Sequence, residues 1–155
     1  MKVVFLDIDG VLNSIRYDRQ RTDNQGNIDE TRLLLIKGLV DATNACIVLT
    51  SSWRKHWEKD AARCDAIGRE LNEIFAKHQV QIYDKTVALP NKDRAQEIRI
   101  WLNLQEEVEE YVIFDDIAFG WGDDLEDHLI KTNPRIGFGL EEMHIQKAME
   151  LLKCK

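Results

Sequence analysis

Two aspartates, Asp7 and Asp9, stand one residue apart in the stretch FLDIDGVLNS, directly after an apolar run over residues 3–6. A carboxylate at the end of a buried strand is costly unless a cation or hydrogen-bond donors offset its charge. Two neighbouring aspartates can also divide a phosphoryl transfer between them, one attacking phosphorus and the other carrying protons. The spacing therefore makes Asp7 a candidate nucleophile and Asp9 a candidate general acid and base.

Further polar side chains follow three later apolar stretches, each of which reads as a strand. They are Thr50, Ser51 and Ser52 after residues 45–49, Lys92 at the start of the helix after residues 80–84, and Asp115 with Asp116 at the end of residues 111–116. Carboxylates held close together raise one another's pKa, and a divalent cation relieves that repulsion. All-oxygen ligands favour Mg²⁺, while hydroxyls and backbone amides at a helix start bind anions. A metal site, an anion site and a lysine together indicate phosphoryl chemistry.

The apolar patterns that must position these side chains alternate between strand and helix. Predicted strands cover residues 2–6, 45–49, 80–84, 111–116 and 128–132, predicted helices cover residues 29–43, 55–77, 92–103 and a last segment from Glu141, and residues 13–28 are predicted to be a loop. This alternation is typical of an α/β doubly wound, Rossmann-like three-layer sandwich with a central parallel sheet. Ligands bind beyond the carboxyl ends of the strands in such sheets, and the polar side chains fall there.

Composition narrows the class of protein. The 155 residues, 44% of them hydrophobic and 32% charged, predict a single domain with one core. A net charge of −7 argues against the broad basic surface of a nucleic-acid-binding module. Cys46, Cys64 and Cys154 form no C-x-x-C pair, so neither a disulfide framework nor a zinc site is expected. Without a signal peptide or an apolar run near the ~18 residues of a membrane helix, a cytoplasmic protein with no membrane partner is predicted.

Four motifs resemble those of the haloacid dehalogenase-like (HAD) phosphohydrolases and occur in the same order. FLDIDGVL resembles the first motif, IVLTSSW the second, NKDRAQEI the third and YVIFDD the fourth, and together they span residues 5–116. The combination of DIDGVLN, LTSSWR and the acidic pair is similar to the small HAD branch found in RNA-repair-like proteins. The resemblance implies a HAD-like fold and a Mg²⁺-dependent phosphatase that acts through an aspartyl-phosphate.

The resemblance also implies a role for each matching residue. Asp7 is the nucleophile and also a metal ligand, and Asp9 is the acid and base, with its carbonyl ligating Mg²⁺. Thr50 binds the phosphoryl oxygens together with the Ser51 amide, and Lys92 steadies the nucleophile and the phosphoryl group. Asp116 ligates Mg²⁺ directly, and Asp115 either ligates it through water or hydrogen-bonds to the groups that do. The family's dehalogenases lack the second aspartate, so Asp9 favours phosphate chemistry.

Several assignments stay open at the level of sequence. Lys85 also follows the third predicted strand and is the alternative to Lys92. The phosphate-binding hydroxyl is that of Thr50 or of Ser51. Arg54, directly after the hydroxyls, is a candidate for holding a second phosphate or a carboxylate. Trp53 is expected to be a packing residue.

The gaps between the motifs indicate how large a substrate the site admits. HAD enzymes carry their cap domains after the first strand or before the third motif, and here those places hold only residues 13–28 and the stretch KTVALPN. Neither holds a folded domain, so a capless enzyme with an open site is predicted. Such a site suits a phosphate on a nucleotide or a nucleic-acid end. Arg16, Arg19 and Arg21 in the predicted loop either help to hold such a polyanion or are simply solvated.

Three other functions use similar residues. A phosphotransferase would pass the phosphoryl group to an acceptor other than water. A receiver-like regulatory domain also binds Mg²⁺ and a phosphoryl group, but its middle strand ends in the phosphorylated aspartate, whereas CIVL ends here in hydroxyls. A metal-dependent glycosyltransferase would leave Lys92 and the second acidic pair unexplained.

Overall fold

A five-stranded parallel sheet forms the centre of the molecule. The structure, a computed structural model, describes residues 1–153. The strands are β1 (Lys2–Leu6), β2 (Cys46–Leu49), β3 (Ile82–Lys85), β4 (Glu110–Asp115) and β5 (Leu129–Lys131), and their order across the sheet is β3-β2-β1-β4-β5. Each pair of neighbouring strands is parallel. The predicted doubly wound α/β fold is confirmed.

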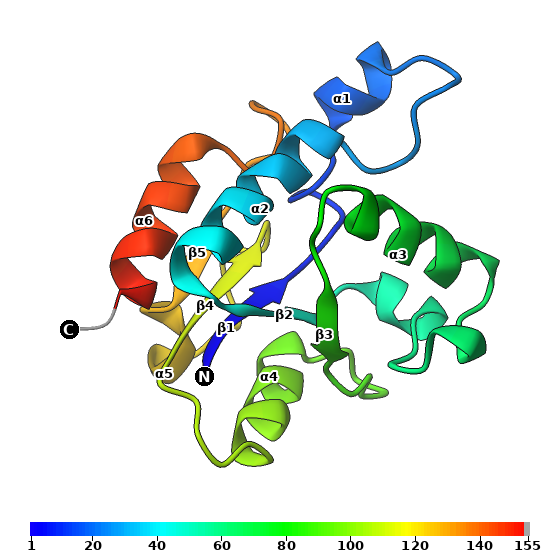
Figure 1. The fold of residues 1–155 in the computed structure, drawn as a ribbon. Helices are drawn as coiled ribbons and strands as arrows, with labels where there is room; N and C mark the ends of the chain where they lie inside the picture. The colour runs from blue at the N-terminus through cyan, green and yellow to red at the C-terminus, as the bar shows by residue number, and fades with distance from the viewer. Residues whose placement is uncertain (154–155) are drawn as a thin grey trace.

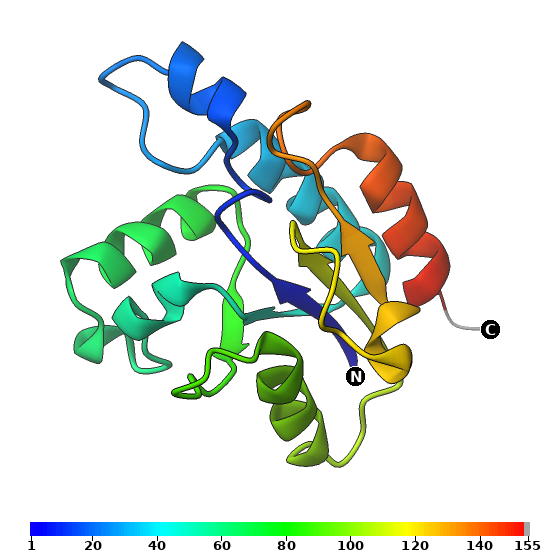
Figure 2. The same cartoon turned by 180° about the vertical axis from the view of Figure 1, so that it is seen from behind.

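Helices cover both faces of this sheet. They are α1 (Ile15–Gln20), α2 (Glu30–Thr43), α3 (Ala66–Lys77), α4 (Arg94–Asn103), α5 (Asp123–Glu126) and α6 (Glu142–Leu152), with 3₁₀ turns η1 (Ser52–His56) and η2 (Ala61–Arg63). Figure 1 shows α2, α3 and α6 on one side of the strands and α4 with α5 on the other. The view from behind gives the same arrangement (Figure 2).

Alternating residues of β1 supply the two halves of the core. Val4 and Leu6 belong to the apolar cluster beneath α2, α3 and α6. Val3 and Phe5 belong to the cluster beneath α4, where the Phe5 ring meets the Trp101 ring edge to face at 5.3 Å. Because successive side chains of a strand point to opposite faces, a strand that is apolar throughout must be covered on both sides. The sheet is therefore fixed firmly enough to hold charged groups at its end.

The predicted helix over residues 55–77 is wrong in its first half. The chain there forms the 3₁₀ turns η1 and η2, and of this range only α3 is α-helical. The carboxylate of Asp60 accepts a hydrogen bond from the N–H of Ala62, and that of Asp65 accepts one from the N–H of Gly68. Aspartate in this position starts a new helix. A side chain at Gly68 would collide with the His56 carbonyl oxygen, so the glycine lets α3 fold back against η1.

Residues 13–28 are not wholly a loop, because α1 lies within them. The Ser14 hydroxyl accepts a hydrogen bond from the N–H of Tyr17 at 3.0 Å and caps this short helix. The Tyr17 hydroxyl in turn donates to the carbonyl oxygens of Gly26 and Ile28, which ties the segment down. This six-residue helix is all that the segment adds in secondary structure, so no cap domain lies between β1 and α2.

Among the described residues, no helix is long and apolar enough to cross a membrane. Cys46 and Cys64 carry free thiols, and Cys154 lies outside the described residues.

Candidate active site

The carboxyl ends of the three central strands meet at one edge of the sheet. Leu6 of β1 pairs with Leu49 of β2 and with Phe114 of β4. The pairing continues one residue further, because the N–H of Asp7 donates to the Phe114 carbonyl at 3.1 Å and the N–H of Thr50 donates to the Leu6 carbonyl at 3.0 Å. Strand register thus places the first, second and fourth motifs side by side.

Three carboxylates form a cluster at this edge. Oxygens of Asp7, Asp115 and Asp116 lie within 4.8 Å of one another. Burial raises the pKa of Asp7 to about 7, and the charge of Asp115 adds to the rise while Arg94 opposes it. Burial and the charge of Asp115 also raise the pKa of Asp116. Such a crowd of oxygen ligands suits a hard divalent cation, and a cation here would offset both the buried charge and the repulsion between the carboxylates.

The two oxygens of Asp115 are already engaged. One accepts a hydrogen bond from Arg94 at 2.6 Å, and the other accepts one from the N–H of Ile117 at 2.9 Å. Asp116 is half-buried and lies against Gly10, whose φ is +85°. A Cβ at position 10 would come within 2.5 Å of an Asp116 oxygen. The chain turns sharply at Gly10, and glycine is required there both for its φ and for this close approach.

Arg94 supplies the cation that contacts the acids. Its Nη1 donates to Asp7 at 3.0 Å and to Asp115 at 2.6 Å. The side chain is well placed because α4 begins at Arg94. The Asp93 carboxylate caps this start of the helix by accepting a hydrogen bond from the N–H of Gln96. The positive side chain of the third motif that contacts the acids is therefore Arg94, two residues after the predicted Lys92.

The two lysines considered from the sequence lie elsewhere. Lys92 is exposed, with a φ of +56°, in the turn before α4. The Lys85 ammonium donates to the carbonyls of Arg54 and Trp57 at 3.0 Å and 2.6 Å, and it pairs with Glu58. Lys85 thus secures the end of η1, and Arg94 makes the contact with Asp7 that was predicted for Lys92.

The Asp9 carboxylate lies at the opening of the site, between two side-chain donors. Its Oδ1 accepts a hydrogen bond from Asn13 Nδ2 at 2.9 Å, and its Oδ2 accepts one from the Trp53 indole at 3.1 Å. Asn13 is itself fixed, because its Oδ1 accepts from the N–H of Gly10 at 2.9 Å. Asp9 is exposed where Asp7 is 4% exposed, so the two acids of the first motif have distinct surroundings.

Thr50 and Ser51 differ in what their hydroxyls do, although both residues are fully buried. Ser51 Oγ accepts a hydrogen bond from the N–H of Trp53 at 3.2 Å and so caps η1. Thr50 Oγ1 is buried and has no hydrogen-bond partner among the described residues. A buried hydroxyl without a partner is costly, and a bound anion would satisfy it. Of these two hydroxyls, that of Thr50 is therefore the one without a hydrogen-bond partner among the described residues.

Arg54 is buried in an ion pair rather than placed at the opening. Its Nη2 pairs with the carboxylate of Glu97, and its Nη1 donates to the Thr50 carbonyl. Glu97 is 1% exposed and also accepts a hydrogen bond from the N–H of Leu89 at 2.8 Å. These contacts differ from the predicted phosphate-binding role. Arg54 instead joins α4 to the segment that carries Thr50.

Replacing Glu97 with glutamine should destabilise the protein, because the Arg54 guanidinium would keep a buried charge without its partner. We expect the free energy of unfolding to fall by about 3 kcal/mol, in the range for breaking a buried ion pair. Urea denaturation followed by circular dichroism measures this change. Glu73→Gln on the exposed face of α3 is the matched control, with an expected change below about 0.5 kcal/mol. Equal effects of the two substitutions would contradict the role given to Glu97.

Asp7 should destabilise the metal-free protein as the pH rises toward neutrality. Its folded pKa of about 7 lies above the ordinary aspartate pKa of 3.8, so the folded state binds this proton more tightly than the unfolded state does. The resulting stabilisation is fully present below pH ~4 and is lost as the pH rises through ~7. Asp7→Asn should therefore stabilise the metal-free protein more at pH 8 than at pH 5, by roughly 2 kcal/mol.

Thermal unfolding in EDTA at the two pH values measures this difference. Mg²⁺ should reduce it at pH 8, because the bound cation would offset the Asp7 charge. Asp123→Asn, an exposed substitution on α5, should show no such pH dependence. A smaller gain for Asp7→Asn at pH 8 than at pH 5 would show that burial of the Asp7 charge is not the cause.

Four side chains at or behind the site lie outside the roles predicted from sequence: Arg94, Asn13, Glu97 and Trp53. For Arg94 a signal was present, since Asp93 is a strong helix N-cap residue and places Arg94 at the first helical position. Asn13 and Trp53 act through contacts with Asp9 that no local pattern reports. Glu97 reads as an ordinary polar residue of an amphipathic helix.

Comparison with known proteins agrees with this geometry. A family model described as the HAD domain in Swiss Army Knife RNA repair proteins matches residues 3–143. Neither the curated proteins nor the solved structures contain a match to the chain. The family match covers β1 to the start of α6 and includes every residue of the acidic cluster, Arg94 and Thr50. The chain therefore belongs to the family of HAD domains found in Swiss Army Knife RNA repair proteins.

Proposed function

We propose that the protein is a Mg²⁺-dependent phosphatase that hydrolyses phosphomonoesters through an aspartyl-phosphate on Asp7. Membership of the HAD family supports a phosphohydrolase in general. The observation that carries the specific proposal is the cluster of Asp7, Asp115 and Asp116 on the same sheet edge as the unpartnered hydroxyl of Thr50.

The acidic cluster fits a magnesium ion. Asp7 and Asp116 would supply carboxylate oxygens, and the Asp9 carbonyl would supply a third oxygen. Asp115 would not ligate the ion directly, because Arg94 and the Ile117 amide already hydrogen-bond to its two oxygens. When bound, Mg²⁺ supplies positive charge that offsets the phosphoryl oxygens and the crowded carboxylates.

In the first step the Asp7 carboxylate attacks phosphorus, and the bond from phosphorus to the ester oxygen breaks. Arg94, at 3.0 Å from Asp7, holds the attacking group in place. The Thr50 hydroxyl donates to a phosphoryl oxygen, in the manner of a preorganised donor. Asp9 gives its proton to the leaving oxygen, and it can reach that oxygen because it lies at the opening of the site.

In the second step water attacks phosphorus, and the bond from phosphorus to Asp7 breaks. Asp9, now a carboxylate, takes the proton from the water. Asn13 and Trp53 hold one Asp9 oxygen each, so the carboxylate keeps its orientation through both proton transfers. Inorganic phosphate leaves, and both aspartates return to their starting states.

Phosphorylated nucleic-acid ends are the substrate class that we propose. The family description refers to RNA repair proteins, and the opening beside Asp9 and Asp116 is a cavity of about 480 Å³ without a cap domain over it. The arginines in and directly after α1 add little support. The Arg16 guanidinium lies over the Phe138 ring at 5.1 Å, and Arg21 donates to Asn27 at 2.7 Å, so both have partners within the chain.

Removing the metal tests the proposed function. We expect the protein to release phosphate from an aryl phosphate in Mg²⁺ and to lose this activity in EDTA, because the carboxylates would then repel the substrate. Addition of Mg²⁺ should restore the activity. Phosphate release that continues unchanged in EDTA would contradict the proposal.

A further inference from the structure

We infer that a second pocket, next to the opening of the active site, binds the nucleobase of the phosphorylated nucleotide. This inference rests on the proposed phosphatase function and deepens it. The pocket has a volume of about 300 Å³ and lies between α3, η1 and residues 26–28. It shares Asn27 and Trp53 with the opening that contains Asp9 and Asp116.

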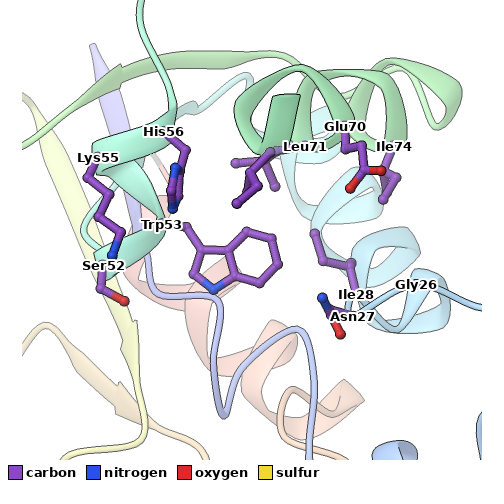
Figure 3. A pocket seen from close by; sticks show the side chains of 11 residues that line it. Gly26, Asn27, Ile28, Ser52, Trp53, Lys55, His56, Glu70, Leu71 and Ile74 are labelled. Carbon is purple, nitrogen blue, oxygen red and sulfur yellow. The ribbon is translucent and has the colours of Figure 1, made fainter. Parts of the chain in front are cut away.

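Trp53 connects the two cavities. Its indole N–H donates to Asp9 at 3.1 Å, while its ring belongs to the lining of the second pocket. Figure 3 shows the indole lying across the middle of the pocket, between α3 and the segment of Asn27 and Ile28. A ring system resting on Trp53 would therefore lie beside the group that we propose protonates the leaving oxygen.

The shape and lining of the pocket favour a flat ring. Ile67, Leu71 and Ile74 of α3 form an apolar wall opposite Trp53. A volume of about 300 Å³ is at the lower end for ligand pockets, which suits one ring system rather than a long chain. Stacking on an aromatic side chain contributes about 1–3 kcal/mol per base.

The polar lining favours a base over a phenyl ring. Glu70 and Asn27 lie at the end of the pocket that is remote from His56 (Figure 3). The Glu70 carboxylate accepts hydrogen bonds and the Asn27 amide also donates them. The edge of a base has donors and acceptors that can pair with these two side chains, whereas a phenyl ring has neither.

The position of the pocket requires a spacer between ring and phosphorus. Its lining includes Trp53 but none of the four acidic residues of the first and fourth motifs. In a nucleotide the ribose separates the base from the phosphate, so the phosphate can reach Asp7 while the base lies on Trp53. In phosphotyrosine the ring is joined directly to the phosphate oxygen and would lie at the aspartates instead.

Oligonucleotides that differ only in their terminal base test this assignment. One pair ends in a 3′-phosphate and a second in a 5′-phosphate, and in each pair the terminal nucleotide either keeps its base or is abasic. We expect kcat/KM for phosphate release in Mg²⁺ to be about 10-fold or more higher with the base at one of the two ends. Ile67→Trp, which fills the pocket from a position that is 43% exposed, should bring this ratio close to 1. Leu34→Trp on α2, 52% exposed and outside the pocket, should retain it.

The possible results separate the pocket from the proposed function. A ratio near 1 in the unchanged protein, or a ratio that Ile67→Trp does not alter, overturns the base pocket while phosphate release upholds the phosphatase. A phosphotyrosine peptide that outperforms both oligonucleotides, with a preference lost in Ile67→Trp, also overturns it. If no phosphate is released from any substrate, the proposed function fails. Calorimetric titration with adenosine then tests whether the pocket binds a nucleobase. Binding that is lost in Ile67→Trp supports it, and no binding to the unchanged protein overturns it.

Discussion

Asp7→Asn is expected to abolish phosphate release, lowering kcat by at least about 10⁴-fold. An amide oxygen cannot replace the carboxylate as a nucleophile, and loss of the attacking group alone removes most of the catalysis in enzymes with covalent intermediates. The substitution preserves the shape of the side chain, and its amide oxygen can still accept from one of the two donors that contact Asp7 in the structure, Arg94 Nη1 and the N–H of Ile8. Steady-state release of inorganic phosphate in Mg²⁺ measures the effect.

The control for this prediction is Asp123→Asn, which removes one carboxylate from the exposed α5 helix and should change kcat by less than about twofold. Rapid quenching in acid adds a second measurement, because the unchanged protein should carry a phosphoryl group on Asp7 during turnover and the variant should not. Turnover that survives Asp7→Asn would exclude Asp7 as the nucleophile. Turnover with no trapped phosphoryl group in the unchanged protein would point instead to direct attack by water.

The sheet and the acidic end of the site could be predicted because they depend on local patterns. A strand that is apolar at every residue, such as β1, requires cover on both faces, and alternating elements then fix a parallel sheet. Once the strands are parallel, residues that follow them must share one edge. The meeting of Asp7, Thr50 and Asp115 therefore follows from the sequence without any knowledge of side-chain contacts.

The remaining features depend on contacts between residues far apart in the chain. Glu97 is buried only because Arg54, 43 positions earlier, pairs with it, and neither residue alone signals the pair. The apolar stripe of the predicted helix 55–77 is compatible with one long helix. Capping by Asp60 and Asp65 outweighs the preference of this stripe for one helix, because each carboxylate satisfies a backbone N–H group that a helix start leaves free.

Arg94→Ala should lower kcat by about 10²–10³-fold, whereas Lys92→Ala should lower it by less than about threefold. Arg94 bonds to both Asp7 and Asp115, so its loss leaves two buried carboxylates without their cation and leaves the nucleophile held, among the described residues, only by the N–H of Ile8. Removing one preorganised donor from a reaction centre typically has an effect of this size. Lys92 is exposed in the preceding turn, where solvent screens its charge. Phosphate release by the two variants in the same Mg²⁺ buffer gives the comparison.

Arg94→Lys separates the need for a charge from the need for a guanidinium. The single nitrogen Nη1 reaches both carboxylates, so an ammonium that reached the same place would restore part of the activity lost in Arg94→Ala. We expect recovery of about 10-fold, because the shorter lysine side chain cannot hold both oxygens at once. Thermal unfolding of each variant shows whether the fold is kept. If Lys92→Ala proved the more damaging substitution, the third-motif cation would be Lys92, and the α4 start would have to shift toward the site when substrate binds.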